Sequence, residues 1–504
     1  MNVEVPKRRS QEIELKLALP SSDIEGMQAA LKKSPLLARR KLIKQTLHSV
    51  YYDTPDQTLR QKRIAMRVRQ IESDKKSTWI QTLKTGDMSA SALSTRGEWE
   101  QAVPSADLCI DALEDSPWHD IDPDGAIFRE LQPCFMTRFE RTSWNVRGHD
   151  GSVAEVSLDI GQIEAGSQSA AICELEIELI SGEPSALFVL ANSISKSVAV
   201  IPANLSKAER GYALAHAILD MPLRARPPQL TADIAVVEAC QLVLRETYSQ
   251  FTGNLGAFQT TDNPEVVHQT RVGWRRFKSA LRLFKPALSQ ERIPDLSPLK
   301  PLLQSLSHLR DLDVALTETL PSIASSYIAN AQDRKKKWDH LEHSLSVAAG
   351  NRRQEVRDTL QDPTVGVTLL AISRFIEECN DRSGRDSQPV VRPLKPWAQR
   401  RVEKLREKVE FALKSVDDEG GQHRARILVK RLRYSVESMQ AVLPTRRARR
   451  WLKRAIALQG SIGSSRDIQR AHTFAVELQA DPDLVEFLRG FGCGLAYGRD
   501  HFRI

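Results

Sequence analysis

The chain has 504 residues, of which 27% are charged and 41% hydrophobic, a composition typical of two or three folded domains and not of a disordered protein. Its net charge of +8 is unevenly distributed, because residues 231–504 hold 44 Lys and Arg against 33 Asp and Glu, whereas residues 1–230 hold 28 against 31. This local basic excess predicts a phosphate-rich partner for the C-terminal part.

Cysteine spacing and hydropathy exclude several other classes of protein. The six cysteines are scattered without a C-x-x-C pair, which argues against a disulfide framework or a structural zinc site and favours a reducing compartment. The first 20 residues lack an apolar core of the signal-peptide type, and no stretch reaches the roughly 18 apolar residues of a membrane span. We therefore expect a cytoplasmic protein that does not bind a membrane.

The first part of the chain has the alternating pattern of β-strands. Apolar and charged residues alternate in seven runs, at 12–19, 63–71, 78–84, 98–103, 139–146, 153–160 and 172–180. Helical patterns are fewer there, at 22–33, 107–113 and 185–199. This part is predicted to be mostly antiparallel β-structure with peripheral helices.

A proline-rich linker at 221–232 separates this β-rich part from a helical one. We expect an α+β protein with one domain at 1–220 and an all-α domain at 233–504. The all-α domain is predicted to consist of two similar helical bundles, at about 233–388 and 389–504.

The strands of the first domain carry charge on one face. Glu12, Glu14 and Lys16 alternate with apolar residues in the first run, and Arg67 and Arg69 do so in the second. An antiparallel sheet with one wet face also alternates in this way. However, carboxylates gather on some strands and arginines on others, as a closed barrel around a charged ligand requires. Carboxylates bind hard divalent cations and Arg and Lys bind phosphate, which is the pairing that phosphoryl transfer needs.

An ordered set of motifs across residues 12–212 resembles the CYTH, or triphosphate tunnel, family. They are EIELK at 12–16, YYDTPD at 51–56, AMRVR at 65–69, WIQTLK at 79–84, RGEWE at 96–100, CELEIEL at 173–179 and SKAERGY at 206–212. The resemblance implies an eight-stranded antiparallel tunnel that hydrolyses or cyclises triphosphates with Mg²⁺ or Mn²⁺.

The resemblance also implies roles for the inward-facing residues. The metal ligands would be Glu12, Glu14, Glu174 and Glu176. The phosphate-binding residues would be Lys16, Arg67, Arg69, Lys84, Arg138 and Lys207. The residues that bind metal or orient water would be Glu98, Glu100 and Asp159. Arg138 and Arg141 have opposite parity, so at most one of them is expected to face inward.

The second domain contains a duplicated helical pattern of histidine and cations. The residues at offsets 0, 3, 7 and 10 are His268, Arg271, Arg275 and Lys278 in one copy and His423, Arg426, Lys430 and Arg433 in the other. These offsets describe one face of a helix. Each copy is followed by an Arg-Asp pair, at 310–311 and 466–467, which either pairs internally or contacts a ligand.

The duplicated pattern resembles the CHAD domain, a conserved-histidine α-helical domain, over roughly 235–500. The motifs HQTRVGWRRFK at 268–278 and LRDLD at 309–313, together with 423–434, carry this resemblance. It implies two bundle-like halves with affinity for inorganic polyphosphate, through the eight residues of the two copies. Few aromatic residues (6%) and no zinc-finger or RNA-recognition signature argue against a nucleic-acid partner.

The sequence therefore predicts a metal-dependent enzyme that hydrolyses inorganic triphosphate to pyrophosphate and phosphate, with a polyphosphate-binding helical domain. One alternative is an enzyme of the same fold that acts on an organic triphosphate, as an adenylate cyclase or a thiamine or nucleoside triphosphatase. Another is a non-catalytic polyphosphate-binding scaffold, against which the set of inward carboxylates argues.

Overall fold

The computed structural model describes residues 11–20, 23–73, 76–86, 91–288, 293–379, 393–414, 419–461 and 464–501. The chain divides into two compact units. The first is the chain up to Met221 with Leu255–Thr261 and Leu360–Arg374, and the second contains the remaining residues. Each unit is described below by itself.

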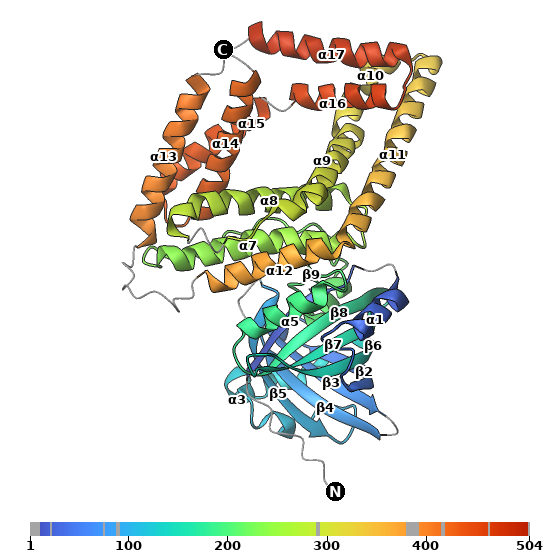
Figure 1. Ribbon diagram of the computed structural model, residues 1–504, viewed down its shortest axis with the longest axis vertical. Coiled ribbons are helices and arrows are strands. Elements are labelled where there is room, and N and C mark those ends of the chain that lie inside the picture. Colours follow the sequence, from blue (N-terminus) through green and yellow to red (C-terminus); the bar gives the residue numbers. More distant parts are fainter. Residues whose placement is uncertain are drawn as a thin grey trace. The chain divides into compact units, whose positions relative to one another are not determined.

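The first unit contains a closed antiparallel β-barrel of eight strands (Figure 1). The strands are β1 (Gln11–Ala18), β2 (Leu42–Asp53), β3 (Ile64–Ser73), β4 (Lys76–Thr85), β5 (Leu93–Val103), β6 (Gln132–Arg147), β7 (Val153–Ala165) and β8 (Gln168–Ser181). Their order is β5-β4-β3-β2-β6-β7-β8-β1, and pairing of β5 with β1 closes the barrel. A short strand β9 (Ile201–Pro202) also pairs with β1.

Apolar residues on the outer face of the barrel form the main core of this unit. Leu15, Leu17, Leu175 and Ile177 are fully buried there. Helices α1 (Ile24–Lys33) and α5 (Ser185–Ser195) supply the apolar side chains that pack against this face of the sheet. Because successive side chains of a strand point to opposite faces, this outward apolar set directs the intervening charged residues into the barrel.

Two expectations for the first unit need correction. Strand β2 was not among the seven predicted runs, because Leu42 and Ile43 are adjacent, exposed and followed by polar residues, so that alternation is weak. The helix predicted at 107–113 is only a 3₁₀ turn, Asp111–Leu113. Short helices also occur at α2 (Thr58–Gln61), α3 (Trp118–Ile121) and α4 (Ala126–Arg129).

Helix α6 (Lys207–Ala215) packs against β6, β7 and β8. The Tyr212 hydroxyl donates to the buried Asp53 carboxylate at 2.7 Å. The same carboxylate accepts the backbone N–H groups of Leu59 and Arg60 at 2.8 and 3.0 Å. Asp53 therefore ties the end of β2 to α2 and α6, which gives the YYDTPD motif a structural role.

The second part of the chain is helical, as predicted, and the α+β fold class is confirmed (Figure 1). Its helices are α7 (Val236–Ala257), α8 (Pro264–Phe284), α9 (Lys300–Val314), α10 (Leu320–Ile328), α11 (Gln332–Leu360), α12 (Pro363–Glu378), α13 (Leu394–Lys414), α14 (Glu419–Met439), α15 (Thr445–Ser461), α16 (Ser464–Glu477) and α17 (Pro482–His501). Short 3₁₀ helices lie at Lys285–Ala287 and Ser297–Leu299, and a π-helix at Ala315–Thr319.

The duplicated motifs occupy equivalent helices of the second unit. One copy of the histidine pattern lies on α8 and the other on α14, and these two helices pack together. The Arg-Asp pairs lie on α9 and α16, which also contact one another. Within the residues that the structure describes, no helix has the length and apolar composition needed to cross a membrane.

Candidate functional site

A first cluster of charged residues in the barrel is built by β1, β4 and β5, and we call it the first carboxylate cluster. Its acids are Glu12, Glu14 and Glu98, and its cations are Lys16, Lys84 and Arg96. Lys84 Nζ lies 3.0 Å from Glu12 and 2.8 Å from Glu98, and Arg96 contacts both Glu12 and Glu14. Burial alone would raise the pKa of Glu12, but Lys84 and Arg96 outweigh burial and lower it.

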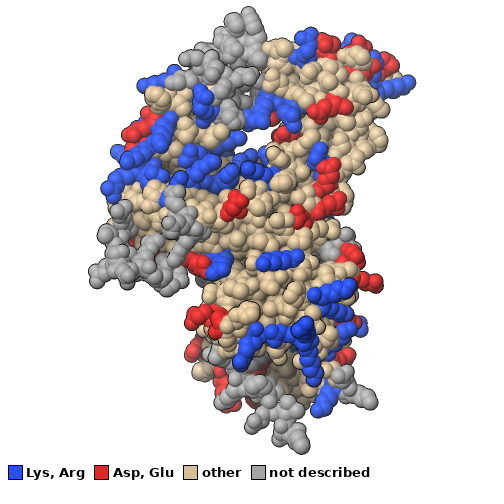
Figure 2. Space-filling view, viewed as in Figure 1, with Lys and Arg blue, Asp and Glu red and all other residues tan. Residues whose placement is uncertain are grey.

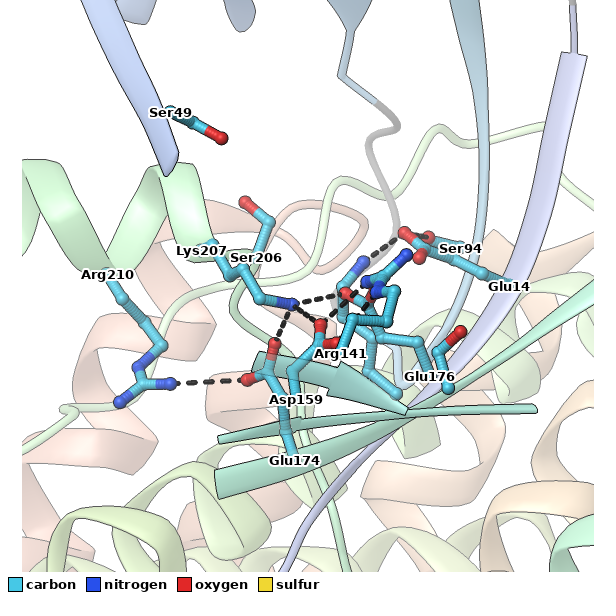
Figure 3. A network of polar contacts seen from close by, with 12 residues as sticks. Glu14, Ser49, Ser94, Arg141, Asp159, Glu174, Glu176, Ser206, Lys207 and Arg210 are labelled. Carbon is cyan, nitrogen blue, oxygen red and sulfur yellow. Dashed lines mark hydrogen bonds and ion pairs between the residues drawn. The ribbon is translucent and has the colours of Figure 1, made fainter. Parts of the chain in front are cut away.

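The second carboxylate cluster joins β7 and β8 and consists of Asp159, Glu174 and Glu176 (Figure 3). One carboxylate oxygen of each lies within 4.8 Å of the others. Lys207 Nζ lies between them, 2.7 Å from Asp159, 2.5 Å from Glu174 and 2.9 Å from Glu176. Arg141 holds both oxygens of Asp159, at 2.7 and 2.6 Å.

The first turn of α6 delivers Lys207 to this cluster. Ser206 caps the helix by a reciprocal pair of hydrogen bonds with Glu209, which fixes where the helix begins. A cation at a helix N-terminus is unfavourable for the helix dipole, but the three carboxylates compensate. Burial alone would lower the pKa of Lys207, and Asp159 and Glu174 raise it instead. Lys207 is therefore charged in spite of its 5% exposure.

A third group in the barrel is dominated by arginine. Arg67 and Arg69 are buried side by side on β3, near the Tyr51 hydroxyl and the carboxylate of Glu100. Arg67 lies 3.5 Å from Glu100, whereas Arg69 donates to the Ser49 hydroxyl at 3.0 Å. Burial and the charge of Arg67 lower the pKa of Arg69 to about 10. An anion beside this pair would relieve their mutual repulsion.

Lys16 lies between the two carboxylate clusters. It contacts Glu14 and is the cross-strand neighbour of Glu176. Its charge lowers the pKa of both Glu12 and Glu176, although burial is the largest influence on each and opposes it. The two clusters are therefore parts of one charged interior, to which seven strands and α6 contribute acids and cations.

The second unit carries cations from both copies of the histidine pattern on one surface. We define the basic surface as Arg271, Arg275 and Lys278 of α8 with Arg426, Lys430 and Arg433 of α14. Lys and Arg gather over this part of the helical unit in Figure 2. Burial lowers the pKa of Lys430 to about 7, assisted by Arg275 and Arg426, so the two helices repel each other across the surface.

The basic surface has few acids to balance its charge. Within the described residues, Asp311 and Asp467 are the acids that raise the pKa of Arg271 and Arg426, but burial and neighbouring arginines lower both pKa values further. One guanidinium Nε–H each of Arg271, Arg275 and Arg426 is buried without an acceptor among these residues. Each such group costs free energy until an acceptor is supplied.

Comparisons with known proteins agree with both parts of this description. A family model of the CYTH domain matches residues 10–212, and a model of the CHAD domain matches residues 242–476. The chain is a CYTH domain joined to a CHAD domain. The resemblances inferred from the sequence motifs are thereby confirmed.

One curated relative is the inorganic triphosphatase of Haemophilus influenzae, 34% identical over 207 residues, which are 40% of this chain and 55% of the relative. The match thus spans about half of that relative. A solved CHAD domain from the plant Ricinus communis shares 26% identity over 56% of this chain and 92% of that one, with a TM-score of 0.46. A Hippeastrum protein, described as a candidate adenylyl cyclase with a dominant triphosphatase activity, shares 21% identity over 41% and 95%, with a TM-score of 0.31.

One residue assigned to the tunnel of the CYTH domain does not lie there. Arg138 is exposed on the outer face of β6, whereas Thr137, Phe139 and Arg141 of opposite parity face the interior. Arg141 therefore takes the place that was predicted for Arg138. Sequence reasoning also missed Arg96 and Arg210, the second of which contacts Glu174 at 3.2 Å, although both lie within quoted motifs.

The remaining predicted residues of the CYTH domain line its interior in different groups from those expected. Asp159 joins Glu174 and Glu176, while Glu12 and Glu14 join Glu98. In the CHAD domain, burial and Arg310 lower the pKa of His268, so the imidazole is neutral near pH 7. The side chain of His423 lies outside the described residues.

We expect Arg141→Gln to destabilise the CYTH domain when metal is removed by a chelator. The change leaves the fully buried Asp159 with Lys207 alone, at a cost of about 1–3 kcal/mol. Hydrogen exchange of peptides from β7 and β8 would report this loss of protection. The matched variant Arg138→Gln, on the outer face, should change it by less than about 0.5 kcal/mol. Equal protection in the two variants would contradict the inward placement of Arg141.

Proposed function

We propose that the chain is a metal-dependent triphosphatase that hydrolyses inorganic triphosphate to pyrophosphate and phosphate inside the barrel. The observation that carries this proposal is the charged interior, where three close carboxylates lie beside lysine and arginine side chains. A site for anions alone has no use for carboxylates, and a site for metal alone has no use for Arg67 and Arg69. Metal-bound triphosphate needs both.

The donor set of the second carboxylate cluster fits a hard divalent cation such as Mg²⁺ or Mn²⁺. Asp159, Glu174 and Glu176 offer oxygen ligands within 4.8 Å of one another, and oxygen is the ligand that these cations prefer. Glu12 and Glu14 offer two further carboxylates. A bound cation would withdraw electron density from the phosphate oxygens and offset their charge.

The cations of the tunnel would hold the chain of phosphates. Arg67, Arg69, Arg141, Lys16, Lys84 and Lys207 are buried or nearly so, and they come from β1, β3, β4, β6 and helix α6. Guanidinium groups donate paired hydrogen bonds to phosphate oxygens. On binding, triphosphate would exchange the internal ion pairs of these cations for contacts with phosphate.

Hydrolysis requires a water molecule in line with the terminal anhydride bond. The oxygen of this water forms a bond to the terminal phosphorus as the bridging P–O bond breaks. The electron pair of the broken bond stays on the departing pyrophosphate. Glu98, Glu100 or Asp159 would accept a hydrogen bond from this water and receive its proton. Such positioning and charge stabilisation account for most of the catalysis of phosphoryl transfer.

The similarity to the Haemophilus influenzae inorganic triphosphatase supports the choice of substrate. An organic triphosphate remains the alternative of the same chemistry. Release of phosphate and of pyrophosphate by the full chain from tripolyphosphate, ATP and thiamine triphosphate with Mg²⁺ distinguishes them, since cyclisation of ATP releases pyrophosphate alone. Faster release from ATP or thiamine triphosphate would overturn the inorganic assignment, and no release from any of the three would favour a binding scaffold.

Glu12→Gln should remove most turnover while the fold persists. Glu12 faces the interior beside Lys84 and Arg96, and the amide loses the charge that balances them and that would hold metal. We expect a fall in kcat of roughly a hundredfold or more, measured as phosphate released from tripolyphosphate. Glu140→Gln, exposed on β6, is the matched control and should retain full turnover. Wild-type turnover in folded Glu12→Gln would refute the role of Glu12.

We further propose that the two parts divide these tasks at the predicted boundary, with hydrolysis in residues 1–220 and polyphosphate binding in 233–504. The basic surface supports the second task. Its cations come from two helices, and too few acids among the described residues lie near them to balance their charge. Some of their N–H groups are buried without an acceptor among the described residues. A flexible linear polyanion satisfies many such groups at once, with strong salt dependence.

Arg271→Ala and Arg426→Ala should each weaken the binding of long-chain polyphosphate, by about 1–3 kcal/mol for a lost charge-assisted contact. The two arginines come from different helices of one surface. Titration at low salt measures the affinity, with Arg449→Ala on the exposed face of α15 as the control. If the double variant binds as tightly as wild type, the shared surface is wrong.

Polyphosphate affinity should also fall as pH rises above about 7. Without ligand the pKa of Lys430 is about 7, because of burial and of neighbouring arginines. A bound anion favours the protonated amine and raises this pKa. The contribution of Lys430 to polyphosphate binding is therefore complete below pH 7 and is lost at higher pH. Lys430→Arg should remove most of this fall between pH 7 and about 9, whereas the exposed control Lys453→Arg should keep it. Identical pH profiles for both variants would exclude Lys430 as the titrating group.

A further inference from the structure

The cationic stripe of α8 continues beyond the duplicated pattern. Arg282 follows Lys278 by four residues, so it lies one turn further along the same face. The equivalent position of the second copy is Glu437, which holds Arg433 at 2.7 Å. The stripe thus ends in an ion pair on α14, but it ends in an added cation on α8.

Helix α13 brings a further arginine to the end of α8. Phe284, two residues beyond Arg282, stacks on Trp397 of α13 with ring centroids 5.0 Å apart and planes at 12°. Arg401, one turn after Trp397, lies over the same ring at 6.0 Å. The aromatic stack therefore fixes α13 against α8 and holds Arg401 near the extended stripe.

Arg431 of α14 completes a group that we call the second basic cluster, formed by Lys278, Arg282, Arg401 and Arg431. Burial, Arg282 and Arg401 lower the pKa of Arg431, and burial and Arg282 lower the pKa of Lys278. Three helices thus direct like charges toward one another, and these neighbours disfavour the charged states of Arg431 and Lys278.

No carboxylate of the described residues balances this cluster. Within the part of the chain that the structure describes, none of the four side chains forms an ion pair or hydrogen bond to an acid. The Nε–H of Arg401 is buried and has no acceptor there. Lys278, Arg401 and Arg431 are half-buried and Arg282 is exposed. Cations gathered in this way without acids are an unfavourable arrangement for folding alone, but they suit the binding of an anion.

We propose that the second basic cluster is an additional subsite for phosphates, which lengthens the basic surface at one end and makes binding depend on chain length. It is continuous with the basic surface through Lys278, and it rests on the proposed polyphosphate-binding function of that surface. Arg271 and Arg282 are eleven positions apart on the helix, which corresponds to about 16 Å. A polyphosphate chain shorter than this span reaches either the basic surface or the second basic cluster, whereas a longer chain contacts both.

The test uses the full chain with a chelator present and compares Arg401→Gln/Arg431→Gln with Arg271→Gln/Arg426→Gln. The matched control, Arg400→Gln/Arg449→Gln, removes the same charge from exposed positions of α13 and α15. Each protein is titrated at low salt with inorganic polyphosphates of graded length. Because the tunnel is unchanged in all of these proteins, it contributes equally to polyphosphate binding in each of them. Circular dichroism and thermal unfolding verify that each variant is folded.

We expect Arg401→Gln/Arg431→Gln to bind long chains about tenfold or more weakly, since two charge-assisted contacts are lost. The affinity of this variant for chains too short to reach from the basic surface to the second basic cluster should equal that of wild type. Its affinity for long chains should depend less steeply on salt concentration. The control should bind all lengths like wild type.

Several outcomes would overturn the subsite, and they are distinguishable from one another. If long-chain affinity falls in Arg271→Gln/Arg426→Gln but not in Arg401→Gln/Arg431→Gln, the second basic cluster is no subsite and the proposed function stands. If wild type itself binds no long chain, or if neither pair of changes weakens binding, the proposed polyphosphate-binding function of the basic surface fails as well. An equal loss for short and long chains in Arg401→Gln/Arg431→Gln would refute the dependence on length.

Discussion

The burial of charges of both signs inside one closed barrel is the constraint on which the CYTH domain depends. Charges removed from water cost free energy unless each finds a partner of opposite sign, and breaking one pair leaves an uncompensated buried charge. Asp159 is fully buried and depends on Arg141 of β6 and Lys207 of α6, while Glu12 depends on Lys84 and Arg96. The register of the strands that carry these charges is therefore fixed twice, by the apolar outer face and by the charged inner one.

Much of this fold was predictable because alternation has a local cause. A strand such as β8 keeps Glu174 and Glu176 on one face and Leu175 and Ile177 on the other, and seven of the eight barrel strands carry such a run. Strand β2 was not predicted because its first three residues are exposed on both faces. The parity of β6 was ambiguous because Arg138 and Arg141 are both cationic, and only the buried Phe139 decides which of them faces inward.

The grouping of the site residues was beyond local sequence patterns, because it follows from which strands become neighbours. Pairing of β1 with β5 puts Glu12 opposite Arg96, and pairing of β7 with β8 puts Asp159 opposite Glu174. A motif read along one strand contains no information on these partners. The duplicated helices are the reverse case, because the repeat itself indicated that α8 and α14 are equivalent, whereas their burial, which lowers the pKa of His268 and Lys430, required the packed structure.

The two units treat their cations in opposite ways, and this difference has a physical consequence for binding. In the tunnel, Lys207 already has three carboxylate partners, so an arriving phosphate must replace interactions that exist. Under the proposed function, Asp159, Glu174 and Glu176 would hold a divalent cation, and its charge would free Lys207 and Arg141 to contact the phosphates. On the basic surface, Arg271 and Arg426 repel other cations and have few acids to release. A polyanion that binds there would not have to displace carboxylates from these cations. Metal should therefore be essential for phosphate binding in the tunnel and dispensable for binding at the basic surface.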